Sequence, residues 1–513
     1  MKEVETMKLA KRLLSLTIAL LMVFALVACN DDPVVTDTGS QGGPNNNTTD
    51  TSSNNTSSEE VEFDPGPRPY DKTTGKTFYV IQHQAPETPF KYSQDSLMGE
   101  KVAERIDEIE AAYGVTFEFV QVAYSDAFAT TMQQMEVTGA GGDIVFSDNN
   151  AKLRLALGTG GDSSLMVDLL TVDHILNFWD MEKWGNITAR ETMMAGGTFY
   201  GVTPALWIDC TPLSYYVMIY NRDMLKTFEA VDPQEAWEKK EWDRDVMLES
   251  ITSVYDDSTG VKIYGIEFGQ VHITRATILS TGCQLANIDK INADGTVEWH
   301  NGWDSADVIE ALQWLKTSYN DNTKYFNGGK FNTDLGWNSY KAVLDGYAAY
   351  ALTRPLGLFG NVVVEADFDF GLTTWAGSEA NILSGYYENC YSVTIPVFTG
   401  MGIENTAFIM WDLFEGMNGI ESYNDLIAYY RNTYFTSDQD VEHLLRDGAT
   451  LMYSYWPNGI DDVINNMTAN LMASATVKGV VDKYVHSQDT AIEEHIVPNK
   501  VALEKYRAEG FFD

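Results

Sequence analysis

The sequence predicts an exported α/β protein whose folded body has two large lobes, each built on a mostly parallel sheet flanked by helices. Three observations predict this class. The chain opens with an export signal, about 440 residues remain after the signal and a polar linker, and the body begins with alternating strand and helix patterns. A body of that length is too large for one hydrophobic core, and a hydrophobic content of 44% excludes a wholly disordered chain.

The export signal covers residues 1–28. A basic segment, Met7–Arg12, precedes the apolar run Leu13–Ala28, which is shorter than the roughly 20 apolar residues that cross a bilayer. Cleavage is therefore favoured over a permanent span. Leu26–Cys29 (LVAC) resembles the bacterial lipobox, which implies that Cys29 takes a diacylglycerol, with a buried structural cysteine as the alternative. We expect a protein anchored by lipid to the extracytoplasmic face of the cell membrane.

Residues 29–75 form a linker rich in Ser, Thr and Asn. Such a segment cannot bury enough apolar surface to offset its ordering entropy, so we expect a disordered leash. The body then divides into residues 76–216 for the first part of an N-terminal lobe and 217–355 for the first part of a C-terminal lobe. Residues 356–513 are expected to return and complete both lobes.

The net charge and the cysteine content limit the partners, disulfides and metal sites that the protein is expected to have. The net charge of −40, from 74 acidic and 34 basic residues, argues against nucleic acid and anionic lipid, because binding either one requires concentrated Lys and Arg. Besides Cys29 the chain has only Cys210, Cys283 and Cys390, with no CxxC spacing. Neither a disulfide framework nor a zinc site is indicated, and we expect no cofactor.

The body opens in the order βαβαβ. The predicted elements are the strand 76–82 (KTFYVIQ), the helix 99–113, the strand 115–122, a helix capped by Ser125, and the strand 143–146 (DIVF). This order implies parallel strands with helical crossovers, and ligands meet such sheets at the carboxyl ends of the strands. The loops at those ends place His83, Gln84 and Asp148 at a candidate site. A second region of strands and helices opens near Val217, and it includes a helix capped by Ser305.

Several short stretches further along the chain follow a shared order. Gly196–Pro204 (GGTFYGVTP) and Ile219–Leu225 (IYNRDML) are the best matched; the weaker pieces are Glu241–Asp243, Asp257–Ile266, Lys341–Tyr350 and Phe368–Leu372. Together they resemble the extracellular solute-binding protein family 1, the receptors of ATP-driven importers, which include the maltose- and sugar-binding proteins. The sequence departs from the family pattern at Thr198, where a lysine is usual, and at Thr373–Trp375, where a proline is usual.

The resemblance implies a type II periplasmic-binding-protein-like fold. In that fold two α/β lobes joined by hinge strands close on a ligand, and a membrane permease recognises the closed form. It implies the substrate-binding component of an ABC importer, which we expect to be a monomer. The chain has 12 Trp and 27 Tyr. This content fits a carbohydrate ligand, since flat aromatic rings cover the C–H face of a sugar while polar side chains satisfy its hydroxyls.

The resemblance also directs attention to individual loops. Trp207, Trp375 and Trp456 lie in loops that the family places at the cleft, although core packing is the alternative for any single Trp. Arg354 precedes Pro355 in a segment whose family counterpart reaches the cleft, and a surface ion pair is its alternative. Tyr386 follows Gly385 in a further loop. With His83, Gln84 and Asp148, these residues make the predicted ligand-binding set.

Two other classes are weighed against a receptor. A secreted, acidic, aromatic-rich chain also fits a glycoside hydrolase with two carboxylates across the scissile bond, but nothing identifies one pair among 74 acids. The HExxH, GxSxG and GxxxxGK[ST] patterns are missing from the sequence. Adhesion and scaffold proteins are usually repetitive, and the sequence has no internal repeat. We therefore expect a binding protein without enzymatic activity.

Overall fold

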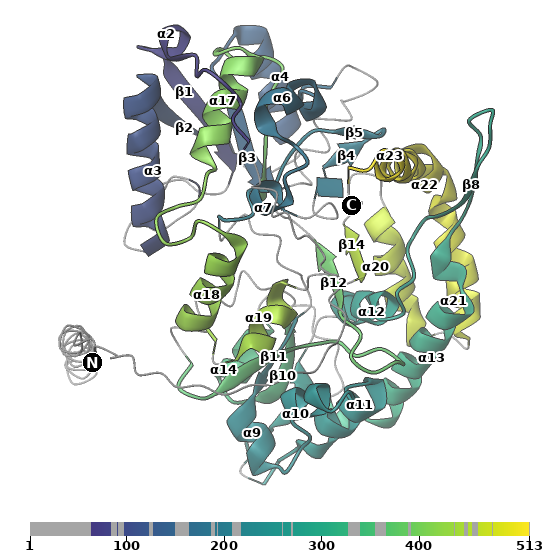
Figure 1. Cartoon of the computed structure of the whole chain (residues 1–513). Helices are drawn as coiled ribbons and strands as arrows, with labels where there is room; N and C mark the ends of the chain where they lie inside the picture. Colours follow the sequence, from purple (N-terminus) through teal and green to yellow (C-terminus); the bar gives the residue numbers. More distant parts are fainter. Residues whose placement is uncertain are drawn as a thin grey trace, which may run out of the picture. The chain divides into compact units, whose positions relative to one another are not determined.

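A computed structural model gives the structure of the chain. It describes residues 63–83, 90, 97–122, 127–148, 164–185, 190–191, 193–207, 217–258, 260–267, 270–326, 339–353, 366–387, 391–435, 437–445, 450–453, 460–473 and 476–511. Residues 1–62, which include the predicted export signal and most of the predicted linker, lie outside the described residues. Two four-stranded sheets with helices packed against them form the framework of the body (Figure 1).

The first sheet has the strand order β13–β3–β1–β2. Its strands are β1 (Thr77–His83), β2 (Thr116–Val122), β3 (Ile144–Asp148) and β13 (Tyr391–Thr394). The pairs β1–β2 and β1–β3 are parallel, and β13 joins β3 antiparallel. With α3 (Leu97–Tyr113) and α4 (Ala127–Thr138) between the strands, the predicted βαβαβ opening is confirmed.

Helix α3 follows its sequence pattern closely. Its buried face carries Val102, Ile106, Ile109 and Tyr113, spaced three or four residues apart. The helix stops at Gly114, whose φ of +64° lies in the left-handed region that favours glycine. A Cβ at this position would also come within 2.9 Å of Thr74 Oγ1. Helix α17 (Ile403–Leu413) packs against both α3 and the short α6 (Asp173–Leu176).

The second sheet has the order β11–β6–β10–β7. Its strands are β6 (Val217–Asn221), β7 (Tyr264–Glu267), β10 (Ala348–Thr353) and β11 (Phe370–Thr374). Strands β7, β10 and β11 share one direction, and β6 opposes them. The first sheet is thus mostly parallel, as predicted, and the second is mixed, because two of its three strand pairings are antiparallel. Each sheet takes one strand from the region after residue 356.

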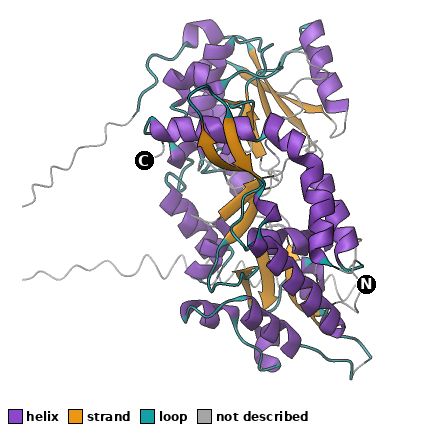
Figure 2. Cartoon of the chain, turned by 90° about the vertical axis from the view of Figure 1, so that its right-hand side faces the viewer, coloured by secondary structure: helices purple, strands orange, loops and turns teal. Residues whose placement is uncertain are grey.

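Helices surround the second sheet (Figure 2). They include α9 (Arg222–Thr227), α10 (Pro233–Glu238), α11 (Arg244–Ser253), α12 (Gln270–Leu279), α13 (Ala306–Asp321) and α14 (Tyr340–Leu344), with the hairpin β8 (Asn287–Ile291)–β9 (Val297–His300) between α12 and α13. Ser305 caps α13 as predicted, because its Oγ accepts the Val308 N–H at 3.3 Å. Asn221 caps α9 in the same way at 2.8 Å.

The remaining elements complete the chain. They are α2 (Tyr70–Thr73), α7 (Met181–Trp184), β4 (Met194–Ala195), β5 (Thr198–Phe199), β12 (Ser384–Tyr387), α18 (Tyr423–Thr433), α19 (Asp438–Leu445), β14 (Thr450–Tyr453), α20 (Ile460–Leu471), α21 (Val477–Tyr484), α22 (Asp489–His495) and α23 (Val497–Ala508). Strands β12 and β14 pair in parallel, and β4 and β5 form an antiparallel hairpin.

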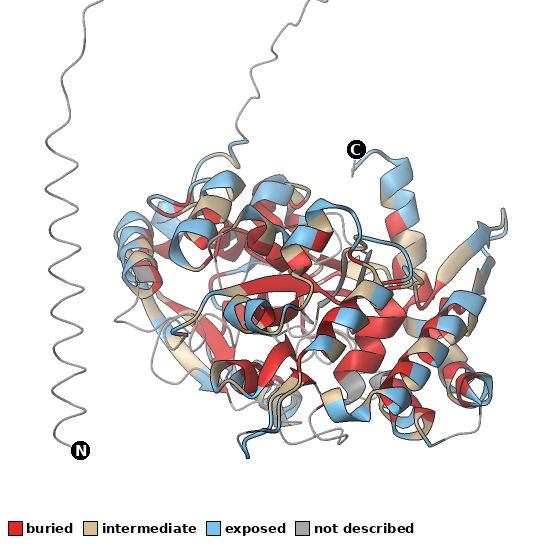
Figure 3. Ribbon diagram, turned by 90° about the horizontal axis from the view of Figure 1, so that it is seen from below, coloured by how far each residue is buried: buried red, intermediate tan, exposed pale blue. Residues whose placement is uncertain are grey.

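Two large hydrophobic clusters occupy the interior, where Figure 3 shows the buried segments. The first core packs against the first sheet and one face of the second sheet, and the second core packs against the other face of the second sheet. Strand β6 shows the division, since Val217 and Ile219 belong to the first core while Met218 and Tyr220 belong to the second. This alternation is the two-residue period of a strand that is buried on both faces.

Helix α19 covers the free edge of β11. Asp440 accepts the Leu372 N–H at 2.6 Å, and His443 Nδ1 donates to the Leu372 carbonyl at 2.9 Å. Asp440 is 1% exposed, and its carboxylate also pairs with Arg222 Nη2 at 3.1 and 3.2 Å. Burial raises the pKa of Asp440, and the Arg222 charge opposes that rise. Two side chains of one helix therefore satisfy a strand residue that has no neighbouring strand on that side.

We predict that Asp440→Ala lowers the free energy of unfolding by about 3 kcal/mol, because it removes the buried carboxylate paired with Arg222 and leaves the Leu372 N–H without that acceptor. Asp440→Asn costs less, because the amide oxygen still accepts the N–H. Urea unfolding of both variants tests this order. Equal losses in the two variants would show that the bond to Leu372 contributes nothing.

Candidate ligand-binding site

The parallel strands β1 and β3 of the first sheet end in polar residues. Strand β1 ends at His83 and β3 ends at Asp148, on neighbouring strands. Strand β13 begins at Tyr391, directly opposite Asp148. The structure thus places His83 and Asp148, both predicted from sequence, at one sheet edge and adds Tyr391 to them.

The second sheet has a matching edge. Strands β7, β10 and β11 end there at Glu267, Thr353 and Thr374, while β6 begins there at Val217, which pairs with both threonines. Glu267 is only 2% exposed. The strands at this edge therefore end in one acidic residue and two threonines, in the position where open α/β sheets bind ligands.

Helix α12 starts three residues after β7 and contacts both β12 and β14. Its first two turns carry His272 and Arg275, which are 8% and 3% exposed. Tyr386 lies on β12, opposite Met452 of β14. Strand β14 ends at Tyr453, so the predicted Trp456 follows it within three residues, outside the described part of the chain. Strand β12, which carries Tyr386, therefore lies next to α12 and to β14, which ends three residues before Trp456.

Four of the predicted residues lie outside the described residues. They are Cys29, Gln84, Arg354 and Trp456. Gln84 directly follows β1 and Arg354 directly follows β10, so the chain enters both segments from the strand ends described above. Their roles stay predictions.

Trp207 lies in the first core with 0% exposure. Its ring meets Phe90 at 5.2 Å and Phe414 at 4.8 Å between centroids. Phe90 is held in turn by its N–H, which donates to the Gln82 Oε1 at 3.1 Å. Trp207 therefore packs against Phe90 and Phe414 inside the first core, and it offers no open ring face for a sugar, as the core-packing alternative describes.

A buried lysine, Lys183, lies next to the segment that carries Trp207. The Ala205 N–H donates to the Lys183 carbonyl at 2.8 Å, and the Lys183 ammonium lies 3.6 Å from the centroid of the Trp411 ring and pairs with Glu415. Burial lowers the pKa of Lys183 to about 8, even though the Glu415 charge opposes that change. Lys183 is 7% exposed, so it acts as part of the support for this segment rather than as a surface group.

Trp375 lies in the second core and is 2% exposed. It follows directly after β11, and its ring meets Trp314 of α13 at 6.4 Å. Its indole nitrogen is buried and makes no hydrogen bond within the described structure. Thr373–Trp375, the place where the family's usual proline is missing, thus supplies a core residue rather than an open ring.

The buried charged residues Glu267 and Arg275, together with His272, were missed by the sequence analysis. The signal is present in the segment 263–279 (IYGIEFGQVHITRATIL), where three titratable residues interrupt an otherwise apolar run. Buried charges of this kind are expected where they have paired or functional roles.

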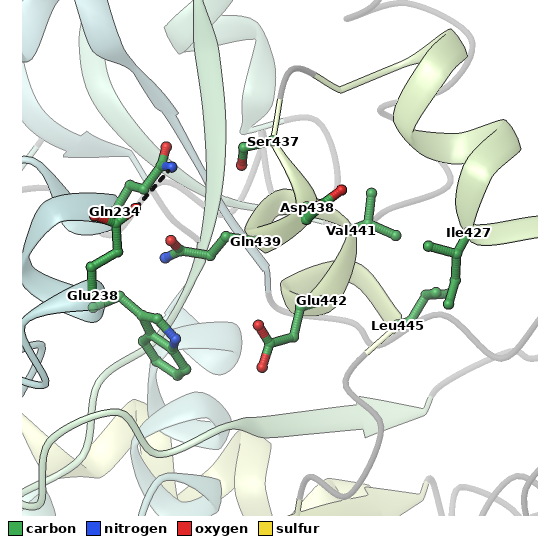
Figure 4. Close-up of a pocket in the computed structure, with 10 residues that line it drawn as sticks. Gln234, Glu238, Ile427, Ser437, Asp438, Gln439, Val441, Glu442 and Leu445 are labelled. Carbon is green, nitrogen blue, oxygen red and sulfur yellow. Dashed lines mark hydrogen bonds between the residues drawn. The ribbon is translucent and has the colours of Figure 1, made fainter. Parts of the chain in front are cut away.

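The described residues also form a pocket of about 660 Å³ away from the strand ends, between α10, α18 and α19 (Figure 4). Gln234 and Glu238 of α10 lie across it from Gln439 and Glu442 of α19. Its apolar wall includes Trp237, whose ring meets His443 at 4.4 Å. The predicted ligand residues that the structure describes do not line this pocket.

The described residues contain no group of three or more His, Cys, Asp or Glu side chains placed to hold a metal ion. Among the helices that the structure describes, none has the length and apolar character needed to cross a membrane.

Two mixed sheets flanked by helices, one of them mostly parallel, fit the predicted class, the type II periplasmic-binding-protein-like fold. Solved structures share it, including the cyclic α-maltosyl-1,6-maltose binding protein from Arthrobacter globiformis, which is 11% identical with a TM-score of 0.56 over 82% of this chain and 99% of that one. An ABC substrate-binding protein from Listeria monocytogenes in complex with cycloalternan is 14% identical, with a TM-score of 0.52 over 82% and 99%. The GacH receptor of Streptomyces glaucescens, solved unliganded and with acarbose, is 12% identical, with a TM-score of 0.52 over 82% and 98%.

Comparison by sequence adds no closer relative. No family model matches the chain, and no curated protein matches it. At 11–14% identity, the three solved structures establish the fold.

We predict that Trp207→Ala lowers the free energy of unfolding by about 3–5 kcal/mol, because it removes a fully buried ring from the first core. Thermal and urea unfolding measure the loss. The matched control is Trp299→Ala, on the half-buried face of β9, which costs less. If Trp207→Ala leaves stability unchanged, the ring is not a core residue.

Proposed function

We propose that this protein is the substrate-binding component of an ABC importer and that it captures a carbohydrate. One observation carries the proposal: the fold matches that of sugar-binding ABC receptors over about four fifths of the chain. The ligand would bind at the carboxyl edges of the two sheets, where the strand ends carry His83, Asp148, Tyr391 and Glu267.

The ligand class is inferred from similar proteins and from side-chain chemistry. One of the similar structures is named as a cyclic α-maltosyl-1,6-maltose binding protein. The other two were solved in complex with cycloalternan and with acarbose. In this chain the strand edges and α12 supply carboxylate, hydroxyl, imidazole and guanidinium groups, which pair with sugar hydroxyls. Tyr386 and the predicted Trp456 would supply the aromatic faces.

Binding without chemical change is part of the proposal. The similar structures are binding proteins rather than enzymes. A glycoside hydrolase remains the alternative class, and it differs by forming a product.

The cellular setting follows from the sequence signal. We infer that Cys29 carries a lipid anchor, that residues 29–75 tether the body outside the cell membrane, and that a permease receives the ligand from it. We infer a monomer, because one chain contains both sheets. Membrane fractionation tests the anchor: the Cys29→Ala variant moves to the soluble fraction, and its retention in the membrane would contradict lipidation.

Titration with a saccharide panel tests the function. Calorimetry with maltose, maltotetraose, cycloalternan, acarbose and ribitol is expected to show reversible binding of at least one saccharide. Chromatography of the same mixtures is expected to return the saccharide unchanged. A hydrolysed saccharide would contradict the receptor and favour a glycoside hydrolase. The absence of binding across the panel would contradict a carbohydrate ligand.

We predict that Trp456→Ala weakens binding of the best saccharide by more than about 1 kcal/mol, as expected for the loss of an aromatic anchor. Trp299→Ala is again the matched control, since it removes the same side chain from a hairpin distant in sequence from the candidate site. Unchanged affinity in Trp456→Ala would exclude Trp456 from the site.

A further inference from the structure

The last helix of the chain, α23, grips a hairpin that is remote from it in sequence. Asn499 is 3% exposed and uses both ends of its amide on the β4–β5 hairpin. Its Nδ2 donates to the Met194 carbonyl at 3.1 Å, and its Oδ1 accepts the Gly197 N–H at 2.9 Å. The packing is close, since a Cβ at Gly197 would lie 3.2 Å from the Cβ of Ala502.

One ion pair and three aromatic contacts add to these hydrogen bonds. Lys500 pairs with Glu191 at 2.9 Å, and Glu191 is only 7% exposed. Tyr506 meets Phe199 of β5 at 5.9 Å and Trp179 at 5.1 Å between ring centroids. Phe511, just beyond the helix, stacks on Trp179 at 4.6 Å. The contacts therefore run along the whole length of α23.

The hairpin belongs to the side of the first sheet. It leads directly to Val202, which exchanges two backbone hydrogen bonds with Val393 of β13, at 3.0 and 2.8 Å. Phe199 and Val202 both lie in the first core. Any movement of the first sheet would thus carry the hairpin with it.

The other end of α23 belongs to the side of the second sheet. Val497, its first residue, and Ile496 before it lie in the second core. The helix also contacts α22 and β8, which lie beyond α12 in the chain. Figure 1 shows α23 beside β4 and β5 and next to α22. One helix of 12 residues therefore joins elements of both sheets.

We propose that α23 is a strap that sets ligand affinity by resisting relative rotation of the two sheets, without touching the ligand. This inference rests on the proposed function, in which the two sheets move together around a saccharide. A contact that forms in only one relative orientation of the two sheets stabilises that orientation and so changes the free-energy difference between the orientations. The apparent affinity then follows the population of the arrangement that binds ligand.

Substitutions that weaken the contacts of α23 and a disulfide that fixes them must change the ligand affinity in opposite directions. Asn499→Ala and Tyr506→Ala each remove one grip on the hairpin, and Lys505→Ala, on an exposed residue of the same helix, is the matched control. The pair Gly197→Cys with Ala502→Cys locks the strap by a disulfide. Gly197 has a φ of +82°, so the reduced form of this same variant is the reference for any strain.

The first readout is calorimetry with the tightest saccharide of the panel. Both loosening variants are expected to change Kd at least threefold in one shared direction, and Lys505→Ala leaves it unchanged. Oxidation of the double-cysteine variant is expected to shift Kd in the opposite direction from its reduced form. A fall in melting temperature with unchanged Kd in both loosening variants would overturn the strap and leave α23 as a stabilising helix.

The second readout needs no ligand, so it separates this inference from the proposed function. Spin labels at Val137→Cys on α4 and Ile291→Cys on β8, with the other cysteines replaced by serine, report the distance between the two sides. Both sites are exposed. The loosening variants are expected to broaden or shift this distance distribution. An identical distribution would overturn the strap even if saccharide binding is established, and a changed one supports it even if the panel shows no binding.

Discussion

The antiparallel pairing of β13 with β3 is the contact on which the candidate site depends. This four-residue strand sets Tyr391 opposite Asp148 and bonds Val202 through Val393. Strand β11, which ends at Thr374, belongs to the second sheet, and β13, which begins at Tyr391, belongs to the first, so the chain crosses between the sheets between these two residues. The first sheet is complete only after this crossing, because β13 lies beyond it, whereas all four strands of the second sheet precede it.

Helices tie distant segments to the sheets by one repeated device. Asp440 and His443 of α19 bond the N–H and carbonyl of Leu372, and Asn499 of α23 bonds the backbone of Met194 and Gly197. Buried backbone groups must be paired, and a polar side chain on a helix does this where no neighbouring strand is available. Such bonds fix geometry across hundreds of residues of sequence, which apolar packing alone specifies less strictly.

The sequence predicted the local elements better than the site. The pattern at Val102, Ile106 and Ile109 predicted α3, and Ser305 marked the start of α13, because periodicity and capping depend on near neighbours. The tryptophans are the contrast. Trp207 and Trp375 were predicted at the cleft but are buried. The sequence could not distinguish the two places, because a single aromatic residue beside a turn is compatible with a core as well as with a cleft. Only the set of rings around each position distinguishes the two.

The sequence by itself determined the alternation of strand and helix, the direction of the first three strands, and the edge at which His83 and Asp148 lie. These features follow from short-range periodicity and from the geometry of parallel crossovers. The tertiary structure alone decided that β11 and β13 join different sheets, that Glu267, His272 and Arg275 are buried beside the strand ends, and that α23 returns to the β4–β5 hairpin. Those outcomes depend on which distant backbone groups remain to be paired, and no local pattern encodes that choice.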